Sequence, residues 1–170
     1  MTPLHMAAQH GHLDVVKYLT IESHCNPLNR DTKGNTPLHY AALLGHFKVV
    51  EFLISELNCD PNTPGRWGRT PLHAAAQAGC LEIVKYVIEE LKCNPSHLDE
   101  QKATPLHLAA MHGHLDVVKY LTRDKLCNPL CRDKYPFTPL HYAAQEGHLE
   151  VVKYFIEILN CPPTLEDIAT

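Results

Sequence analysis

One tetrapeptide, Thr-Pro-Leu-His, recurs along the chain at a constant interval. It begins at Thr2, Thr36, Thr70, Thr104 and Thr138, so successive copies lie 34 residues apart with no insertion between them. The same interval separates Ala-Ala pairs, a glycine after each pair, and two β-branched residues after each glycine. A constant period of this size is typical of arrays in which each unit stacks on its neighbours. The period therefore predicts an elongated repeat array instead of a fold built around one central core.

Each unit carries the signals of two short helices. In the second copy, Thr36 is a suitable N-cap, and Pro37 suits the first helical position, where its missing N–H costs nothing. Gly45 should end this helix, because glycine readily adopts the left-handed conformation. A second helix is expected from Phe47 onward, where apolar residues recur at helical spacing, and Asn58 should close it. The expected unit is an antiparallel helix pair preceded by a projecting turn.

These motifs resemble those of the ankyrin repeat. The turn reads Asp-x-x-Gly-x-Thr-Pro-Leu-His, the first helix continues as Ala-Ala-x-x-Gly-His, and the second contains Val-Val-x-x-Leu. The resemblance implies an all-α ankyrin-repeat solenoid of five stacked helix-turn-helix units with projecting β-turn or hairpin loops. It covers all 170 residues as a single domain, with repeats at about 1–34, 35–68, 69–102, 103–136 and 137–170.

The sequence departs from the family pattern in the length of the repeat and in some glycines. The period exceeds the usual ~33 residues by one, and the extra residue falls near the C-terminal end of the second helix. The glycine usual there is replaced by His24, Asn58, Lys92, Leu126 and Asn160. In the turns, Gly65 stands in place of Asp, while Lys102 and Pro136 stand in place of Gly. Because proline cannot take a positive φ, we expect the turn before the fifth repeat to have a different shape.

The two ends of the array lack the polar outer face that terminal repeats normally carry. We therefore expect end-to-end self-association through the uncapped terminal repeats. Asp167 lies in register with the turn aspartates and predicts the start of a sixth turn. Two alternative interpretations stay open: a targeting or regulatory fragment of a larger enzyme or channel, and a constructed repeat protein with no native partner.

Composition argues against several classes of partner and compartment. The formal net charge is -4 with no basic block, so nucleic acid is not an expected partner. No apolar run approaches the ~20 residues of a membrane span, and no signal-peptide pattern is present. Five of the seven cysteines occupy one repeat position. Stacked helices lie ~8–10 Å apart, too far for disulfides, so we expect reduced packing residues and an intracellular, cytoplasmic protein.

Histidine and cysteine invite a catalytic or metal-binding interpretation, but their positions argue against it. Most of the 13 histidines recur at two repeat positions, where we expect them to hydrogen-bond nearby turn backbone. Cys80 lies in a row between His46 and His114, one repeat from each, beyond the reach of a Cys–His nucleophile pair. We therefore expect no enzyme activity, no catalytic residue, no metal site and no cofactor. Metal buffering through His and Cys is the weaker alternative.

Positions that differ between repeats are the candidates for partner binding. In the ankyrin family such positions line the concave face and the turn tips, and the resemblance implies the same here. In the turns these residues are Arg66, Trp67, Arg69, Arg132, Lys134, Tyr135 and Phe137. On the first helices they are Tyr40, Leu43, Leu44, Gln77, Met111, His112, Tyr142 and Gln145.

The sequence thus favours a non-catalytic protein-interaction module or scaffold. Trp, Tyr and Arg are the residue types enriched at interface hot spots. Trp67 lies between two arginines in a turn with two glycines, which should let the ring reorient. We expect another protein as partner, with an acidic surface and apolar pockets, laid across repeats two to five. The alternatives are that Trp67 packs back on its own repeat, or that a partner binds the outer helices.

Overall fold

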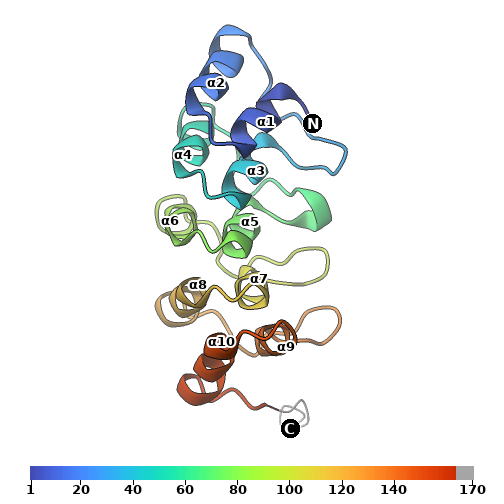
Figure 1. Cartoon of the computed structure of the whole chain (residues 1–170), viewed down its shortest axis with the longest axis vertical. Coiled ribbons are helices and arrows are strands. Elements are labelled where there is room, and N and C mark those ends of the chain that lie inside the picture. The colour runs from blue at the N-terminus through green and yellow to red at the C-terminus, as the bar shows by residue number, and fades with distance from the viewer. Residues whose placement is uncertain (164–170) are drawn as a thin grey trace.

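Helix pairs stack into an elongated column in chain order (Figure 1). This computed structural model describes residues 1–163. The first helices of the pairs are α1 (Pro3–Gln9), α3 (Pro37–Leu43), α5 (Pro71–Ala78), α7 (Pro105–Met111) and α9 (Pro139–Gln145). The second helices are α2 (Leu13–Lys17), α4 (Phe47–Ser55), α6 (Leu81–Lys85), α8 (Leu115–Lys119) and α10 (Leu149–Lys153). No strand occurs in residues 1–163, so the predicted all-α solenoid with projecting turns is confirmed.

The extra residue of the period lies in the second helix. Four of these helices continue directly as π-helical segments, at Tyr18–Glu22, Tyr86–Glu90, Tyr120–Asp124 and Tyr154–Ile158. A π-turn closes its hydrogen bond over five residues instead of four, and so takes up one residue more than an α-turn. In these four units the π-helical segment therefore accommodates the extra residue of the period.

Each second helix ends on a non-glycine residue in the left-handed conformation. Asn58 has φ +53°, as predicted, and the N–H of Cys59 then bonds to the carbonyl of Leu53 at 3.0 Å. This bond reaches back six positions, one more than the corresponding bond of a Schellman cap, and Cys59 follows the left-handed residue directly. Cys59 is buried, and burial raises the pKa of its thiol to about 11. All seven thiols are free, so the cysteines serve as packing residues.

The turn before the fifth repeat has a different shape, as expected. Pro136 does take a positive φ, but its +25° is far from the +59° to +85° of Lys102, Gly68 and Gly34 at the same position of the other turns. The side chain of Asp133 accepts the N–H groups of Tyr135 at 2.8 Å and Phe137 at 3.0 Å, which holds the turn. The turn also lacks a bond of the kind that Gly34 donates to the Asp31 carbonyl at 3.0 Å, because proline has no N–H.

The core runs continuously along the stack. The leucines of Thr-Pro-Leu-His are buried, and the alanine pairs allow the first helices to approach one another closely. At the N-terminal end this core is open: Val15 is 47% exposed, whereas its equivalent Val49 is 1% exposed. The predicted sixth turn around Asp167 lies outside the described residues.

Candidate functional site

The histidines of Thr-Pro-Leu-His join each unit to the next turn. In His39, Nδ1 accepts the backbone N–H of Thr36 at 3.2 Å, so the proton is on Nε2, which donates to the carbonyl of Arg69 at 3.1 Å. His5, His73 and His107 make the same pair of bonds. Burial lowers the pKa of His39 to about 4. These rings are neutral structural bridges, as the sequence indicated.

The Gly-His histidines make a second inter-repeat bridge. Nε2 of His46 lies 2.9 Å from the carbonyl of Gln9, and its ring lies over Gly11, where a Cβ would come within 2.5 Å of Nδ1. Cys80 lies over Gly45 in the same way. In residues 1–163 no group of three or more His, Cys, Asp or Glu side chains could hold a metal ion.

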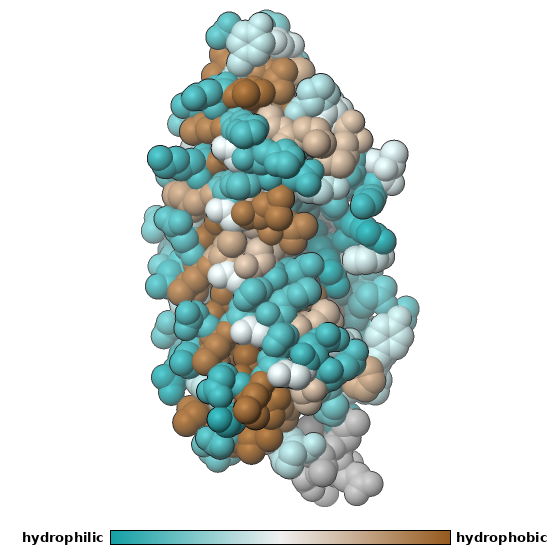
Figure 2. Space-filling view, in the orientation of Figure 1, coloured by the Kyte–Doolittle hydropathy of each residue, from teal (hydrophilic) through white to brown (hydrophobic). Residues whose placement is uncertain are grey.

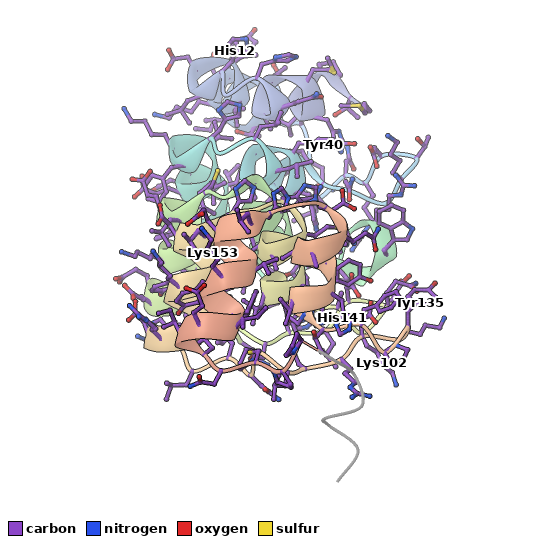
Figure 3. All side chains as sticks on the ribbon, turned by 60° about the horizontal axis from the view of Figure 1, so that its bottom comes forward. His12, Tyr40, Lys102, Tyr135, His141 and Lys153 are labelled. Atoms are coloured by element: carbon purple, nitrogen blue, oxygen red, sulfur yellow. The ribbon has the colours of Figure 1, made fainter. Side chains whose placement is uncertain are left out.

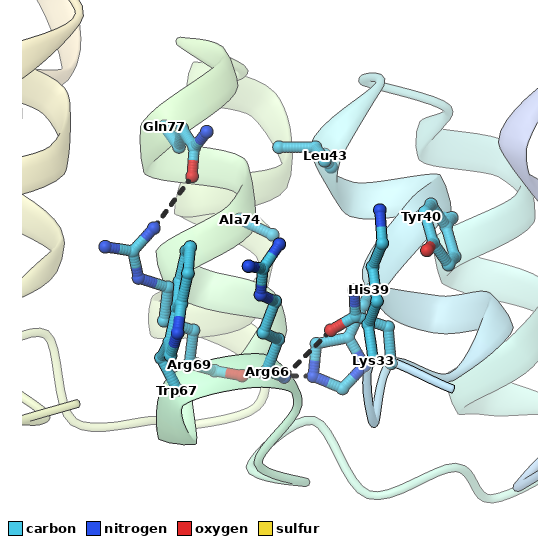
Figure 4. A pocket seen from close by; sticks show the side chains of 10 residues that line it. Lys33, His39, Tyr40, Leu43, Arg66, Trp67, Arg69, Ala74 and Gln77 are labelled. Carbon is cyan, nitrogen blue, oxygen red and sulfur yellow. Dashed lines mark hydrogen bonds between the residues drawn. The ribbon is translucent and has the colours of Figure 1, made fainter. Parts of the chain in front are cut away.

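A pocket of about 200 Å³ opens between α3 and α5, beside the projecting turn that precedes α5 (Figure 4). We call it the anchor pocket. Its lining combines turn residues with residues of the two first helices: Lys33, Asn35, His39, Tyr40, Leu43, Arg66, Trp67, Arg69, Ala74 and Gln77.

Trp67 forms one wall of the anchor pocket and is held between two guanidinium groups. The guanidinium carbon of Arg66 lies 3.8 Å from the ring centroid, and that of Arg69 lies 5.0 Å away. Backbone bonds hold the turn, since Trp67 O accepts the N–H of Glu100 at 2.9 Å. The backbone of the turn is thus tied to the next unit, while the ring is 45% exposed, and its freedom to reorient stays a prediction.

The backbone of Trp67 is strained. Its φ is +59°, a conformation that is rare for a bulky side chain. A left-handed L-residue costs roughly 1–2 kcal/mol, and such outliers cluster at binding sites. In this backbone conformation the indole of Trp67 lines the anchor pocket.

The anchor pocket is electropositive. Nε of Arg69 lies 3.1 Å from Oδ2 of Asp99, so this charge is paired. Neither Arg66 nor Lys33 forms an ion pair within the described part of the chain. None of the lining residues is Asp or Glu. Two cations therefore face the pocket without a counterion from residues 1–163.

The anchor pocket exists because the third unit lacks an Asp–Tyr pair found elsewhere. In the second unit, Tyr40 donates its hydroxyl to Asp31 at 2.6 Å; in the fifth, Tyr142 donates to Asp133 at 2.5 Å. The equivalent positions in the third unit are Gly65 and Ala74, so both the carboxylate and the ring are missing. The sequence does carry a signal for this difference: Asp and Tyr lie nine residues apart in the second and fifth units, whereas Gly and Ala stand at those positions in the third.

Asn35 of the second unit bonds to the turn that carries Gly65. Oδ1 of Asn35 accepts the N–H of Arg66 at 2.9 Å. A Cβ on Gly65 would lie 2.6 Å from this oxygen, and equally close to Nε2 of His39. Glycine is therefore required where the turn crosses these two side chains, and it leaves the turn free to present Trp67.

A comparison with protein families now identifies the fold family. The family described as ankyrin repeats (3 copies) matches residues 1–65, 57–133 and 91–167. The chain belongs to the ankyrin-repeat family. Ankyrin repeats are in general protein-interaction modules. A search of curated proteins found no match to the chain. In the described part of this ankyrin array, no helix is long and apolar enough to cross a membrane.

The ankyrin array distributes the predicted partner-binding residues over two places. Six of them line the anchor pocket: Tyr40, Leu43, Arg66, Trp67, Arg69 and Gln77. Four more, Arg132, Lys134, Tyr135 and Phe137, lie on the turn before α9, next to Tyr142. Tyr135 is 56% exposed and projects on the same side as Lys102 (Figure 3).

The remaining four predicted residues lie at the C-terminal ends of first helices, outside the anchor pocket. Leu44 is 48% exposed. His112 stacks beside His114 with ring centroids 6.3 Å apart, and Gln145 bonds to Glu146. Met111 O accepts the bridge from His148. Along the face in Figure 2, hydrophobic patches alternate with hydrophilic side chains.

Proposed function

We propose that this ankyrin array is a non-catalytic protein-interaction module whose partner lies across repeats two to five. The partner contacts the anchor pocket, the turn before α9 and the free ends of the first helices. The single observation that carries the proposal is Trp67, strained and half-exposed beside a pocket with two unpaired cations. A large exposed aromatic flanked by arginine is the composition of an interface hot spot.

The partner chemistry follows from the charges and the aromatic rings. Arg66 and Lys33 at one site, and Arg132 and Lys134 at the other, favour an acidic partner surface. Trp67 and the exposed rings of the last turn favour apolar groups between the acids. We place the protein in the cytoplasm, where buried unpaired thiols stay reduced.

Replacing Trp67 tests the proposal. Trp67→Ala should weaken binding of a partner isolated by unbiased pull-down about thirtyfold or more, since hot-spot truncations cost at least ~2 kcal/mol. Isothermal titration calorimetry with the purified partner measures this change. Tyr18→Ala is the control, because Tyr18 is 57% exposed but lies at the end of a second helix, away from the turns. Unchanged affinity of the Trp67→Ala protein would refute the proposed surface.

A further inference from the structure

We propose that the anchor pocket takes the side-chain carboxylate of one Asp or Glu in an extended acidic segment of the partner protein. This inference rests on the proposed function and assigns the residue that anchors the partner. The anchor pocket between α3 and α5 thereby determines which partner sequences the array binds.

Charge is the first argument. Lys33 and Arg66 extend in the same direction on two sides of the pocket (Figure 4). Neither has an acidic partner in residues 1–163, and no carboxylate lines the pocket. Bringing an anion between them forms charge-assisted hydrogen bonds, which are stronger than neutral ones. A cationic ligand would meet two like charges and no acceptor of opposite sign.

Shape is the second argument. The pocket has a volume of about 200 Å³ and is bounded by Leu43, Ala74 and the Trp67 ring. This space suits one side chain of an extended segment, with its methylene groups against the apolar residues and its oxygens toward Lys33 and Arg66. It is too small for a helix, whose diameter with side chains is ~10–12 Å.

Comparison with the other units is the third argument. In the second and fifth units the same place is filled by the chain itself, through Tyr40 on Asp31 and Tyr142 on Asp133. In the third unit, Gly65 and Ala74 remove the negative charge and the ring together. At this place the third unit therefore has neither the carboxylate nor the ring, and an external carboxylate can replace the internal one.

Selection from a library of random peptides displayed on phage tests the inference. The full chain should enrich peptides that share one acidic residue next to an apolar one. A synthetic copy of a selected peptide in which that residue is changed from Glu to Gln should bind about tenfold or more weakly, because only the charge is lost. Equal binding of the Glu and Gln peptides would overturn the assignment.

Filling the pocket is the second arm. Ala74→Tyr places in the third unit the residue that Tyr40 and Tyr142 already supply at the same repeat position, and should weaken binding of the selected peptide about tenfold or more. Met6→Tyr is the matched control. It makes the same change at the equivalent position of the first unit, where Met6 is 45% exposed, and should leave binding unchanged.

Charge reversal keeps the inference testable if Ala74→Tyr fails to fold. Arg66 is exposed, so Arg66→Glu should fold, and it should select peptides with Lys or Arg where the original protein selects an acid. Unchanged selection by Arg66→Glu would overturn the pocket assignment.

The arms separate the two proposals. If peptides bind Ala74→Tyr as tightly as the original protein but lose affinity for Trp67→Ala, the interaction surface stands and the pocket assignment fails. If no peptide is selected, or if Trp67→Ala binds the selected peptides unchanged, both proposals fail.

Discussion

Two residues, Trp67 and Leu126, occupy the left-handed region for different reasons. Trp67 has φ +59° in a turn that presents its ring beside the anchor pocket, so the strain accompanies a candidate function. Leu126 has φ +52° at the end of the fourth second helix, and its side chain is 83% exposed. Nothing packs on Leu126 that would offset the cost of this conformation. Its conformation accompanies the bond that closes the helix end, in which the N–H of Cys127 reaches back to the carbonyl of Leu121 at 2.9 Å.

Leu126→Gly should stabilise the protein. Removing a left-handed non-glycine residue recovers roughly 1–2 kcal/mol, less the ~0.5–1 kcal/mol that glycine loses in backbone entropy. We expect a net gain of about 1 kcal/mol in the free energy of unfolding, measured by urea titration. Asn58→Gly is the matched control, because Asn58 has the same conformation and asparagine tolerates it better. A loss of stability in Leu126→Gly, or an equal gain in the control, would contradict this reasoning.

At the scale of the element, the units are joined by two histidine bridges. The Gly-His bridge is made by His46, His114 and His148, each with Nε2 2.9 Å from a carbonyl in the preceding unit. Cys80 interrupts this row, and its sulfur lies 3.9 Å from the Ala78 carbonyl in its own unit. The interface between the second and third units therefore lacks a bond that its neighbours have.

Cys80→His should restore the missing bridge. The new ring would lie over Gly45 with Nε2 directed at the Leu43 carbonyl, as His46 lies over Gly11. A net hydrogen bond contributes about 0.5–1.5 kcal/mol, so the thermal midpoint should rise. Calorimetry measures the change.

The reverse exchange at the first unit is the control. His12→Cys should have little effect, because His12 is exposed and makes no such bridge to a preceding unit. A Cys80→His protein no more stable than the original would show that the bridge contributes nothing at this interface.

At the scale of the whole molecule, a line of buried neutral histidines runs through the stack. Burial lowers the pKa of His39 and of His73 to about 4 and also lowers the pKa of His107. Each of these rings needs an unprotonated Nδ1 to accept a threonine N–H. The stack is thus held by groups that function only in their neutral form. The ends of this stack expose apolar residues such as Val15, and end-to-end association stays a prediction.

Acid should therefore destabilise the array. An unfolded histidine has a pKa of about 6.5, so between that value and about 4 the unfolded chain binds protons that the folded chain does not. Stability is present above pH ~6.5 and is lost as the pH falls toward ~4. At pH ~5 the loss is about 2 kcal/mol for each of His39 and His73, at ~1.4 kcal/mol per pKa unit.

Urea titrations across this pH range measure the loss. His73→Gln should be less stable at neutral pH but should show a shallower dependence on pH, because one titrating group is gone. Leu126→Gly is the control, because it removes no titrating group and should leave the slope unchanged. Stability that is constant from pH ~7 to ~4 would be incompatible with buried neutral histidines.

Much of the fold could be predicted from the sequence because its signals are local and repeated. Thr36 and Pro37 begin a helix, and Asn58 ends one, because of the backbone conformations that these residues prefer. The constant interval between the motifs predicts that the units stack in chain order. The cysteine positions follow in the same way, since Cys59 comes directly after the left-handed residue that ends the second helix. Because each motif recurs in all five units, each local preference is supported five times along the sequence.

The candidate site was only partly predictable, because its geometry depends on contacts between units. The sequence identified Trp67 and its flanking arginines, but only the fold shows that Asp99 of the next unit pairs with Arg69, while Arg66 has no acidic partner in residues 1–163. Likewise, the hollow at Ala74 is recognisable only when the Asp–Tyr contacts of other units are known. By itself the sequence determined the helix pairs, their caps and their period, which depend on neighbours along the chain. The tertiary structure alone decided which charges remain unpaired and where a pocket opens, since both depend on side chains about thirty residues apart that meet only after the units stack.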